Sequence, residues 1–186
     1  MKIVNVGHFT GTSMNKEKIK NAIRNIPDFP KTGIQFKDIT TLLLDHCAFS
    51  ESIDIFCDEF GNSEIDLIVG IESRGFIFGA PLALRLSCPF SIARKPGKLP
   101  AETVSEEYEL EYGTDSVEIH KDAIKEGDRV LIIDDLIATG GTAQAVGELV
   151  TKCRGDITGF GFLINLAELK GSDKLKPHPV FAIIDF

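Results

Sequence analysis

The stretch Arg129–Thr142, RVLIIDDLIATGGT, decides the fold of this chain. Four apolar residues, Val130–Ile133, predict a short buried strand, and Asp134 and Asp135 follow at its carboxyl end. The next residues predict a tight turn that leads into a helix: Ala138, Thr139, Gly140, Gly141 and Thr142. Paired glycines let backbone N–H groups point inward and a helix N-terminus is partly positive, so the turn suits a phosphate. The two carboxylates suit hydroxyls or a magnesium-bound ligand, so the whole stretch fits a sugar phosphate. An ordinary strand–turn–helix connection of an α/β protein has the same spacing, and the spacing alone leaves both interpretations open.

A second strand–turn–helix unit precedes this stretch. Ile65–Ile71 is uniformly apolar, as in a buried parallel strand, and Glu72-Ser73-Arg74-Gly75 leads from it into an apolar helix over 76–86. Further strands are predicted at Pro89–Ala93, Ile157–Ile164 and Val180–Ile184, and a helix follows the glycine turn. Alternating strands and helices predict an α/β fold with a doubly wound, mostly parallel sheet flanked by helices. Ligands bind beyond the carboxyl ends of such strands, which places Arg74 within reach of Asp134 and Asp135.

The N-terminal region of the chain predicts two helices and a loop. Apolar residues at helical spacing indicate a helix over 15–26, which Pro27 ends, and a second amphipathic helix over 49–60. The segment 28–40 between them is expected to be a loop with an exposed aromatic residue, Phe36. Phe36 either fills a gap in the core or belongs to a binding site, and the pattern leaves both open.

Residues 94–120 differ in character from the rest. Arg94, Lys95 and Lys98 cluster around a Pro-Gly pair, and an acidic run follows them. Alternating apolar residues then predict a hairpin that turns at Gly113-Thr114-Asp115. A mixed charge run is usually a solvated, salt-bridged ribbon. The alternative is a flexible hood over 94–120 that closes on a substrate and excludes water.

Composition limits the classes of function. With 186 residues the chain is expected to form a single domain, in which residues 1–13 can be a disordered tail. A net charge of −8 argues against a nucleic-acid surface, and no apolar run approaches the roughly 20 residues that span a membrane. The N-terminus lacks the apolar core of a signal peptide, and the four cysteines are too irregularly spaced for a zinc site. A cytoplasmic protein with reduced thiols is expected.

The string from the Asp-Asp pair to the glycine turn resembles the PRPP-binding motif of type I phosphoribosyltransferases. Further segments resemble the adenine phosphoribosyltransferase family: IPDFPKTGIQFKDIT at 26–40, ESRGFIFGAPLA at 72–83, RKPGKLP at 94–100 and ELEYG at 109–113. The resemblance implies the type I phosphoribosyltransferase fold, with a hood hairpin and a small N-terminal base-binding segment. It also implies purine salvage by a homodimer, in which adenine and PRPP give AMP and pyrophosphate with Mg²⁺.

The resemblance assigns roles to the residues around the sugar phosphate. Residues 138–142 would hold the 5′-phosphate, and Asp134 and Asp135 would accept hydrogen bonds from the ribose hydroxyls. Mg²⁺ would be held mainly by PRPP, with the two aspartates nearby and no direct side-chain ligand. The pyrophosphate group would be bound by six residues: Ser73, Arg74, Arg94, Lys95, Lys98 and Tyr112. Arg74 would also assist catalysis by neutralising the leaving group.

Base recognition is assigned to the Phe36 segment. Phe36 would stack on the purine with Leu166 as the opposite wall, and the backbone of Gln35 and Lys37 would bind the adenine edge. Commoner family members carry a small apolar residue and an arginine at positions 35 and 37. Glu111 corresponds to the proposed general base of the family, acting at purine N7.

Two other functions remain open at this point. The same enzyme class could act on a 6-oxopurine such as xanthine or guanine, which needs a hydrogen-bond donor where the adenine amino group needs an acceptor. Alternatively, the chain could be a regulator that senses PRPP without turnover. Such regulators usually carry a DNA-binding domain or a basic face, and this acidic chain offers neither.

Overall fold

The structure, a computed structural model, describes residues 12–109 and 113–186. The chain divides into two compact units, residues 1–52 and residues 53–186. The division falls within helix α3, His46–Phe60. The single domain expected from the length stays a prediction.

The first unit contains a short hairpin between helices. Helix α1 spans Thr12–Ala22, strands β1 and β2 span Arg24–Pro27 and Gln35–Asp38, and helix α2 spans Thr40–Leu44. The strands pair antiparallel, with Ile26 opposite Phe36. The expected helix over 15–26 is therefore wrong in its last turn, because a residue before proline is driven towards extended backbone and Ile26 precedes Pro27. The expected loop over 28–40 is likewise wrong at β2.

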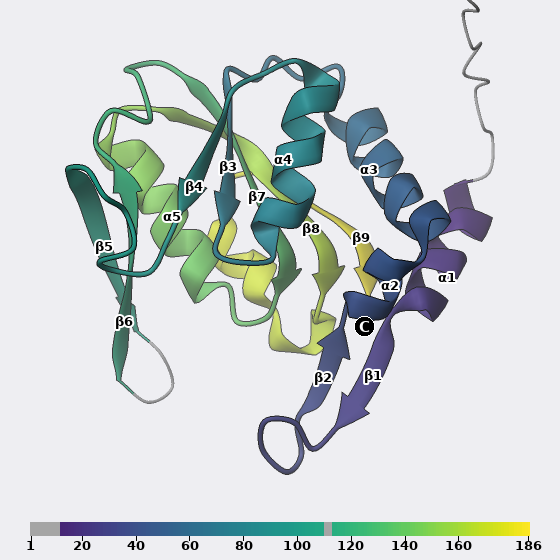
Figure 1. Cartoon of the computed structure of the whole chain (residues 1–186). Helices are drawn as coiled ribbons and strands as arrows, with labels where there is room; N and C mark the ends of the chain where they lie inside the picture. Colours follow the sequence, from purple (N-terminus) through teal and green to yellow (C-terminus); the bar gives the residue numbers. More distant parts are fainter. Residues whose placement is uncertain (1–11, 110–112) are drawn as a thin grey trace, which may run out of the picture. The chain divides into compact units, whose positions relative to one another are not determined.

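The second unit is built on a sheet of parallel strands (Figure 1). Within the described residues its order is β4-β3-β7-β8-β9, where β3 spans Leu67–Ile71, β4 Phe90–Ala93, β7 Arg129–Ile137, β8 Asp156–Asn165 and β9 Val180–Asp185. All the neighbouring pairs are parallel. After β3, the chain adds β4 on one side of it, and then adds β7, β8 and β9 in turn on the other side. The direction of winding thus reverses between β3 and β7, where ligands bind in doubly wound sheets.

The helices of this unit cover both faces of the sheet. Helix α4, Gly75–Leu86, follows β3, and helix α5, Gly141–Lys152, follows β7. Val69 and Ile132 lie in one core cluster with the buried face of α5. Towards α4, Gly70 and Gly79 lie against the ring of Phe90, where a Cβ on either would come within 3 Å of it. The predicted strands and helices of this unit are confirmed, with α5 starting at the second glycine of the turn.

Strand β7 is longer than predicted. It continues through Asp134 and Asp135 to Ile137, because Leu136 and Ile137 still pair with Ile164 and Asn165 of β8. The two carboxylates therefore lie within the last section of the strand rather than after it. Side chains alternate between the faces of a strand, so neighbouring aspartates point in different directions.

The hairpin over 94–120 joins the core of the second unit. Strand β5, Thr103–Glu109, pairs antiparallel with β6, Thr114–His120, and Asp115 stands opposite Tyr108. Asp115 therefore belongs to the strand, and its predicted place in the turn is wrong. Val117 and Ile119 are 2% and 0% exposed and pack with the residues of α5. The base of the hairpin is thus a packed element, which excludes a solvated ribbon there.

Two short 3-10 helices connect β8 to β9: η1, Ala167–Leu169, and η2, Gly171–Leu175. In the described region of the chain, no helix is long and apolar enough to cross a membrane. The four cysteines are free, and burial raises the pKa of the Cys57, Cys88 and Cys153 thiols.

Candidate functional site

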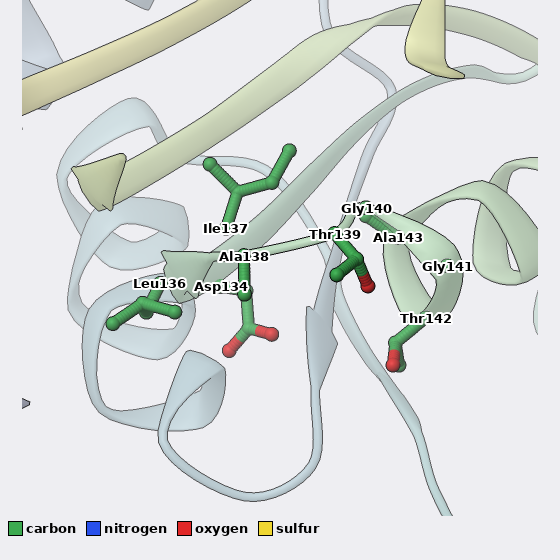
Figure 2. A pocket seen from close by; sticks show the side chains of 9 residues that line it. All are labelled: Asp134, Leu136, Ile137, Ala138, Thr139, Gly140, Gly141, Thr142 and Ala143. Carbon is green, nitrogen blue, oxygen red and sulfur yellow. The ribbon is translucent and has the colours of Figure 1, made fainter. Parts of the chain in front are cut away.

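The glycine turn after β7 lines a cavity of about 120 Å³. It is lined by Asp134 and by residues 136–143, which include every residue of the predicted phosphate turn. Figure 2 shows the Asp134 carboxylate and the hydroxyls of Thr139 and Thr142 on one side of the turn, while Ile137 points to the other. Gly140 precedes α5 with φ +80°, a left-handed conformation that favours glycine. Backbone N–H groups at the start of α5 and a carboxylate thus meet at one hollow.

A second glycine, Gly171, packs against the backbone of this turn. A Cβ on Gly140 would collide with the carbonyl oxygen of Gly171, and a Cβ on Gly171 would collide with that of Ala138 and lie 2.8 Å from the Gly140 nitrogen. The turn and the start of η2 therefore touch backbone to backbone, which only two glycines allow. Gly171 was not predicted as a site residue, because it lies 29 positions beyond Thr142 and no motif there marks the contact.

The two aspartates differ in their surroundings. Asp135 is 4% exposed, and its carboxylate lies 3.0 Å from the Arg74 guanidinium, as the predicted meeting of the two turns requires. Asp134 accepts a 2.8 Å hydrogen bond from the Asp135 backbone N–H. Burial raises the pKa of both carboxyls, and most strongly that of Asp134, where the neighbouring Asp135 charge adds to burial. For Asp135 the Arg74 charge opposes the rise.

The close approach of the two strand ends depends on Gly75. A Cβ at this position would lie 2.6 Å from the Ile133 carbonyl oxygen and 3.0 Å from a carboxylate oxygen of Asp134. The first turn of α4 can therefore pack directly on β7. Ser73 is exposed just before it, in the same turn as Arg74.

Glu72, at the end of β3, holds the cationic segment in place. Its carboxylate accepts hydrogen bonds from Arg94 at 3.0 Å, from Lys98 at 2.8 Å and from the Lys95 backbone N–H at 2.9 Å. Burial acts to raise the pKa of Glu72, but these hydrogen bonds outweigh it and lower the pKa to about 2. The predicted cations Arg94 and Lys98 thus lie at the strand end that also carries Arg74. Glu72 was missed as a site residue, although its place directly after a buried strand was a usable signal.

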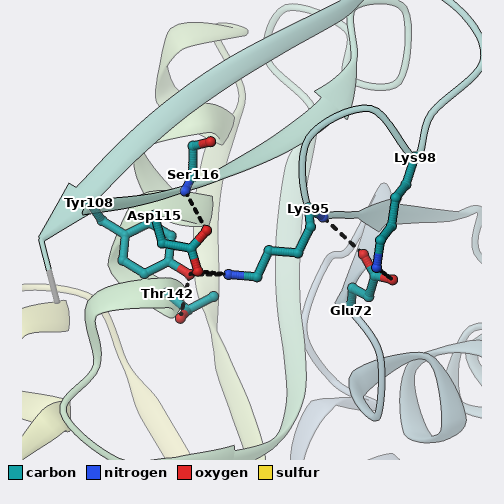
Figure 3. A network of polar contacts seen from close by, with 7 residues as sticks. All are labelled: Glu72, Lys95, Lys98, Tyr108, Asp115, Ser116 and Thr142. Atoms are coloured by element: carbon teal, nitrogen blue, oxygen red, sulfur yellow. Dashed lines mark hydrogen bonds and ion pairs between the residues drawn. The ribbon is translucent and has the colours of Figure 1, made fainter. Parts of the chain in front are cut away.

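Lys95 turns the other way, towards the hairpin (Figure 3). Its ammonium donates a 2.7 Å hydrogen bond to the Tyr108 hydroxyl and pairs with Asp115. Thr142 of the glycine turn donates to the same Tyr108 hydroxyl at 3.2 Å. The structure therefore joins the cationic segment, the hairpin and the phosphate turn in one polar network. Tyr108 and Asp115 were missed because the predicted turn put the hairpin in the wrong register.

The residues predicted to bind the base lie on β2 of the first unit. The Phe36 ring is half-buried and packs edge-on against Phe29, with ring centroids 5.1 Å apart. Gln35 accepts a 2.6 Å hydrogen bond from Asn25, and Lys37 donates to Asn25 at 3.1 Å. These contacts leave the side chains of Gln35 and Lys37 engaged along the hairpin.

Leu166, the predicted opposite wall of the base site, belongs to the second unit. Its backbone N–H donates a 3.0 Å hydrogen bond to the carbonyl oxygen of Ile137, at the end of β7. It is thus tied to the strand end that leads into the phosphate turn, and its stacking with Phe36 stays a prediction. Glu111 and Tyr112 lie outside the described residues, as do residues 1–11 of the predicted tail.

Comparison with known proteins identifies the family. Residues 44–184 match the family model of the phosphoribosyl transferase domain. The adenine phosphoribosyltransferase of Halothermothrix orenii is 56% identical over 167 residues, which are 90% of this chain and 98% of the relative. That of Chloroflexus aurantiacus is 53% identical over 93% of this chain and 100% of its own length.

Solved structures agree with the sequence comparison. The crystal structure of adenine phosphoribosyltransferase from Thermoanaerobacter pseudethanolicus has a TM-score of 0.90 at 54% identity and covers 92% of this chain and 99% of its own. The Saccharomyces cerevisiae enzyme, complexed with D-2,5-dideoxy-2,5-imino-altritol 1,6-bisphosphate and adenine, has a TM-score of 0.87 at 43% identity, covering 92% and 99%. By family match, sequence and fold, the chain belongs to the phosphoribosyltransferases and, within them, to the adenine phosphoribosyltransferase family.

Proposed function

We propose that the protein transfers the 5-phosphoribosyl group from PRPP to adenine, giving AMP and pyrophosphate in purine salvage. The observation that carries the proposal is the cavity that brings the Asp134 carboxylate together with the turn 138–142 at the switch point of the sheet. The complex of the yeast relative with adenine supports adenine as the base.

The sugar phosphate is proposed to bind along residues 134–142. Backbone N–H groups and threonine hydroxyls of 138–142 bind the 5′-phosphate at the N-terminus of α5. Asp134 and Asp135 accept hydrogen bonds from the ribose hydroxyls, which stabilise the ionised form of carboxyls whose pKa is raised by burial. Their negative charge then stabilises the oxocarbenium-like centre that develops at C1′.

Departure of pyrophosphate requires positive charge around the leaving group. Arg74, already at the site through its ion pair with Asp135, is proposed to neutralise it, with the Ser73 backbone, Arg94, Lys98 and Lys95. Tyr112 is proposed to close the site over this group. Glu72 binds Arg94, Lys98 and the Lys95 backbone N–H, so these groups form one cationic segment.

Mg²⁺ is proposed as the cofactor. The described residues hold no cluster of three or more His, Cys, Asp or Glu side chains that could bind a metal by itself. Carboxylates together with substrate phosphates are nevertheless the oxygen ligands that Mg²⁺ uses, and Asp134 beside the phosphate cavity fits that set. When bound through PRPP, Mg²⁺ would neutralise the charge of the pyrophosphate oxygens.

Base binding is proposed to use the hairpin of the first unit. Phe36 stacks on adenine with Leu166 opposite, and backbone groups of Gln35 and Lys37 bind the purine edge. Backbone contacts do not depend on side-chain identity, which fits the engagement of both side chains with Asn25. Glu111 is proposed as the general base that removes the proton from purine N7 and makes N9 a better nucleophile.

The assembly is proposed to be a cytoplasmic homodimer. In such a dimer the segment with Arg94 and Lys98 reaches the active site of the other subunit. Each site would then need two chains.

The test is AMP formation from adenine, PRPP and Mg²⁺, with hypoxanthine, guanine and xanthine assayed in parallel. Turnover with adenine alone is expected. Turnover with a 6-oxopurine instead would assign a different base specificity to the Phe36 hairpin. PRPP binding without turnover on any base would identify a regulator and contradict the proposed function.

A further inference from the structure

We propose that Tyr108 is a positioning residue of the phosphoribosyl site: its hydroxyl orients the Thr142 hydroxyl for the 5′-phosphate, and Asp115 and Lys95 hold the phenol in place. This proposal rests on the proposed function and deepens it, since it adds residues to the phosphate subsite. It concerns the hairpin β5–β6, which the sequence motifs do not connect with the phosphate turn.

The Tyr108 hydroxyl is the point where three separate segments meet. It accepts hydrogen bonds from Thr142 Oγ1 at 3.2 Å and from Lys95 Nζ at 2.7 Å. It donates to Asp115 Oδ2 at 3.2 Å, and Lys95 pairs with the same carboxylate. Figure 3 shows these groups converging on the phenol hydroxyl. The Lys95 ammonium also lies 5.2 Å from the centre of the Tyr108 ring, which adds a cation–π contact.

These contacts use the full hydrogen-bonding capacity of the Tyr108 hydroxyl. A tyrosine hydroxyl has one hydrogen to donate and two lone pairs that accept. Asp115 takes the hydrogen, while Lys95 and Thr142 donate to the lone pairs. The single hydroxyl hydrogen of Thr142 is therefore directed at Tyr108, while Thr142 itself remains in the lining of the phosphate cavity.

Binding of a phosphate would reverse the direction of this bond. A phosphate oxygen is an anionic acceptor and forms a stronger hydrogen bond than a neutral phenol does. The Thr142 hydrogen would rotate to the phosphate, and the Tyr108 hydrogen would rotate from Asp115 to the Thr142 oxygen. Asp115 would keep its pairing with Lys95. Two hydroxyl rotations are enough for this change, and no proton is transferred between residues. The Tyr108 hydroxyl is hydrogen-bonded to Thr142 both before and after the phosphate binds.

The hairpin itself is anchored independently of this hydroxyl. The Tyr108 side chain packs against the core cluster that contains Val117 and Ile119, and the backbone of Arg94 exchanges two hydrogen bonds with Glu118 of β6. Phenylalanine at position 108 would keep the ring packing and remove only the hydroxyl. Tyr108→Phe therefore isolates the positioning contact from the fold of the hairpin.

The test is a double-mutant cycle on the binding of ribose 5-phosphate, measured by isothermal titration calorimetry. This probe carries the sugar and the 5′-phosphate but neither the base nor pyrophosphate. Tyr108→Phe is expected to weaken binding about two-fold to ten-fold, as for the loss of one hydrogen bond. Because Tyr108 acts through Thr142, the double variant Tyr108→Phe/Thr142→Val is expected to bind no more weakly than Thr142→Val alone. Effects that simply multiply would overturn the proposal.

A second variant and a control complete the experiment. Asp115→Asn removes the ion pair with Lys95 and so weakens the support that holds the phenol in place. It is expected to cause a smaller loss of affinity that also disappears in the Thr142→Val background. Glu107→Gln removes a carboxylate from the exposed side of the same strand and is expected to leave the affinity unchanged. In turnover, Tyr108→Phe is expected to raise KM for PRPP more than it lowers kcat, since the contact lies away from the reacting C1′.

The outcome separates this proposal from the proposed function. Coupled losses of ribose 5-phosphate binding in a protein that forms no AMP would refute the proposed function and keep Tyr108 as a positioning residue. Normal AMP formation together with undiminished ribose 5-phosphate binding by Tyr108→Phe would refute the role of Tyr108 alone. Failure of the wild-type protein to bind ribose 5-phosphate would also refute it.

Discussion

Two adjacent aspartates carry much of the chemistry at the scale of single residues, yet their surroundings differ. Asp135 is buried and ion-paired with Arg74, whereas Asp134 reaches the phosphate cavity beside the Asp135 charge. The sequence predicted both aspartates at the carboxyl end of the strand, and the family resemblance assigned both to the ribose hydroxyls. The pairing of β7 with β8 continues past both aspartates, so both belong to the strand. Because side chains alternate between the two faces of a strand, the two carboxylates lie in different surroundings.

Asp134→Asn is predicted to lower kcat/KM about a hundredfold, because it removes negative charge beside the developing positive charge at C1′. The same change is predicted to stabilise the fold at neutral pH. The pKa of Asp134 is higher in the folded protein than in the unfolded chain, so ionisation of this carboxyl lowers the free energy of unfolding. Its contribution to stability is fully present below the unfolded-state pKa and is lost as the pH rises through the folded-state pKa. The variant should therefore melt about 2–4 °C above wild type at pH 8 and close to it at pH 4.

The control for this variant is Asp156→Asn, the same substitution at an exposed position at the start of β8. It should leave both activity and the pH dependence of Tm as in the wild type. Wild-type kcat/KM in Asp134→Asn would contradict the ribose-binding role. A Tm difference that does not grow with pH would contradict the effect of burial.

Glu72→Gln is predicted to act on stability with the opposite pH dependence. A pKa of about 2 lies below that of a free glutamate, about 4.3, so the carboxylate stabilises the fold above that value and loses this effect as pH falls towards 2. The variant should be less stable by about 2 kcal/mol at pH 7 and converge with wild type near pH 2. Urea unfolding between pH 2 and 7 measures the difference.

Glu126→Gln provides the comparison, because the Glu126–Arg154 pair is about three-quarters exposed on both sides. Exposed pairs contribute little, so this substitution should change stability by less than about 1 kcal/mol. Equal effects of Glu72→Gln and Glu126→Gln would show that the carboxylate of Glu72 is not a special anchor of the cationic segment.

At the scale of elements, the sequence predicted what is local and missed what depends on pairing. The apolar runs of β3, β4, β8 and β9 and the glycine turn before α5 are contiguous in sequence and were recognised. The end of β7 and the register of β5 with β6 are set by neighbouring strands, and both were displaced in the prediction. The early end of α1 has two causes: Ile26 before Pro27 is driven towards extended backbone, and the strand formed there pairs with β2.

Gly171→Ala is predicted to displace the backbone of the phosphate turn, residues 138–142. A methyl group there would collide with the Ala138 carbonyl oxygen, which is backbone and cannot rotate away as a side chain could. The turn must shift, so KM for PRPP should rise about tenfold and the free energy of unfolding should fall by about 1–3 kcal/mol. Kinetics and urea unfolding measure both effects.

Ser172→Ala, one residue further along η2, is the matched control for Gly171→Ala and should have no effect on KM. An unchanged KM in Gly171→Ala would mean that the turn tolerates displacement of its backbone. In that case the two-glycine contact would serve packing alone.

At the scale of the whole molecule, an acidic chain is proposed to bind polyanionic substrates. The net charge is −8, so attraction of PRPP depends on local cations such as Arg74, Arg94 and Lys98. The sequence could identify this cluster but not its arrangement. Glu72 pairs with Arg94 and Lys98, and Asp115 pairs with Lys95, and these contacts join segments that are distant in sequence.

Subunit complementation tests the proposed homodimer. If Arg94 serves the site of the other subunit, Arg94→Ala chains and Asp134→Asn chains are each inactive alone but form one complete site in a mixed dimer. Random mixing should then restore about a quarter of wild-type activity, since half of the dimers are mixed and each has one complete site. No recovery, with mixed dimers verified by mass spectrometry, would place Arg94 in the site of its own chain.

The most direct measurement is a crystal structure of the protein with AMP bound. The account predicts the 5′-phosphate among the backbone N–H groups of 138–142, the ribose hydroxyls on Asp134 and Asp135, and the adenine ring against Phe36. A phosphate bound away from the turn 138–142, or an adenine that does not contact Phe36, would contradict it.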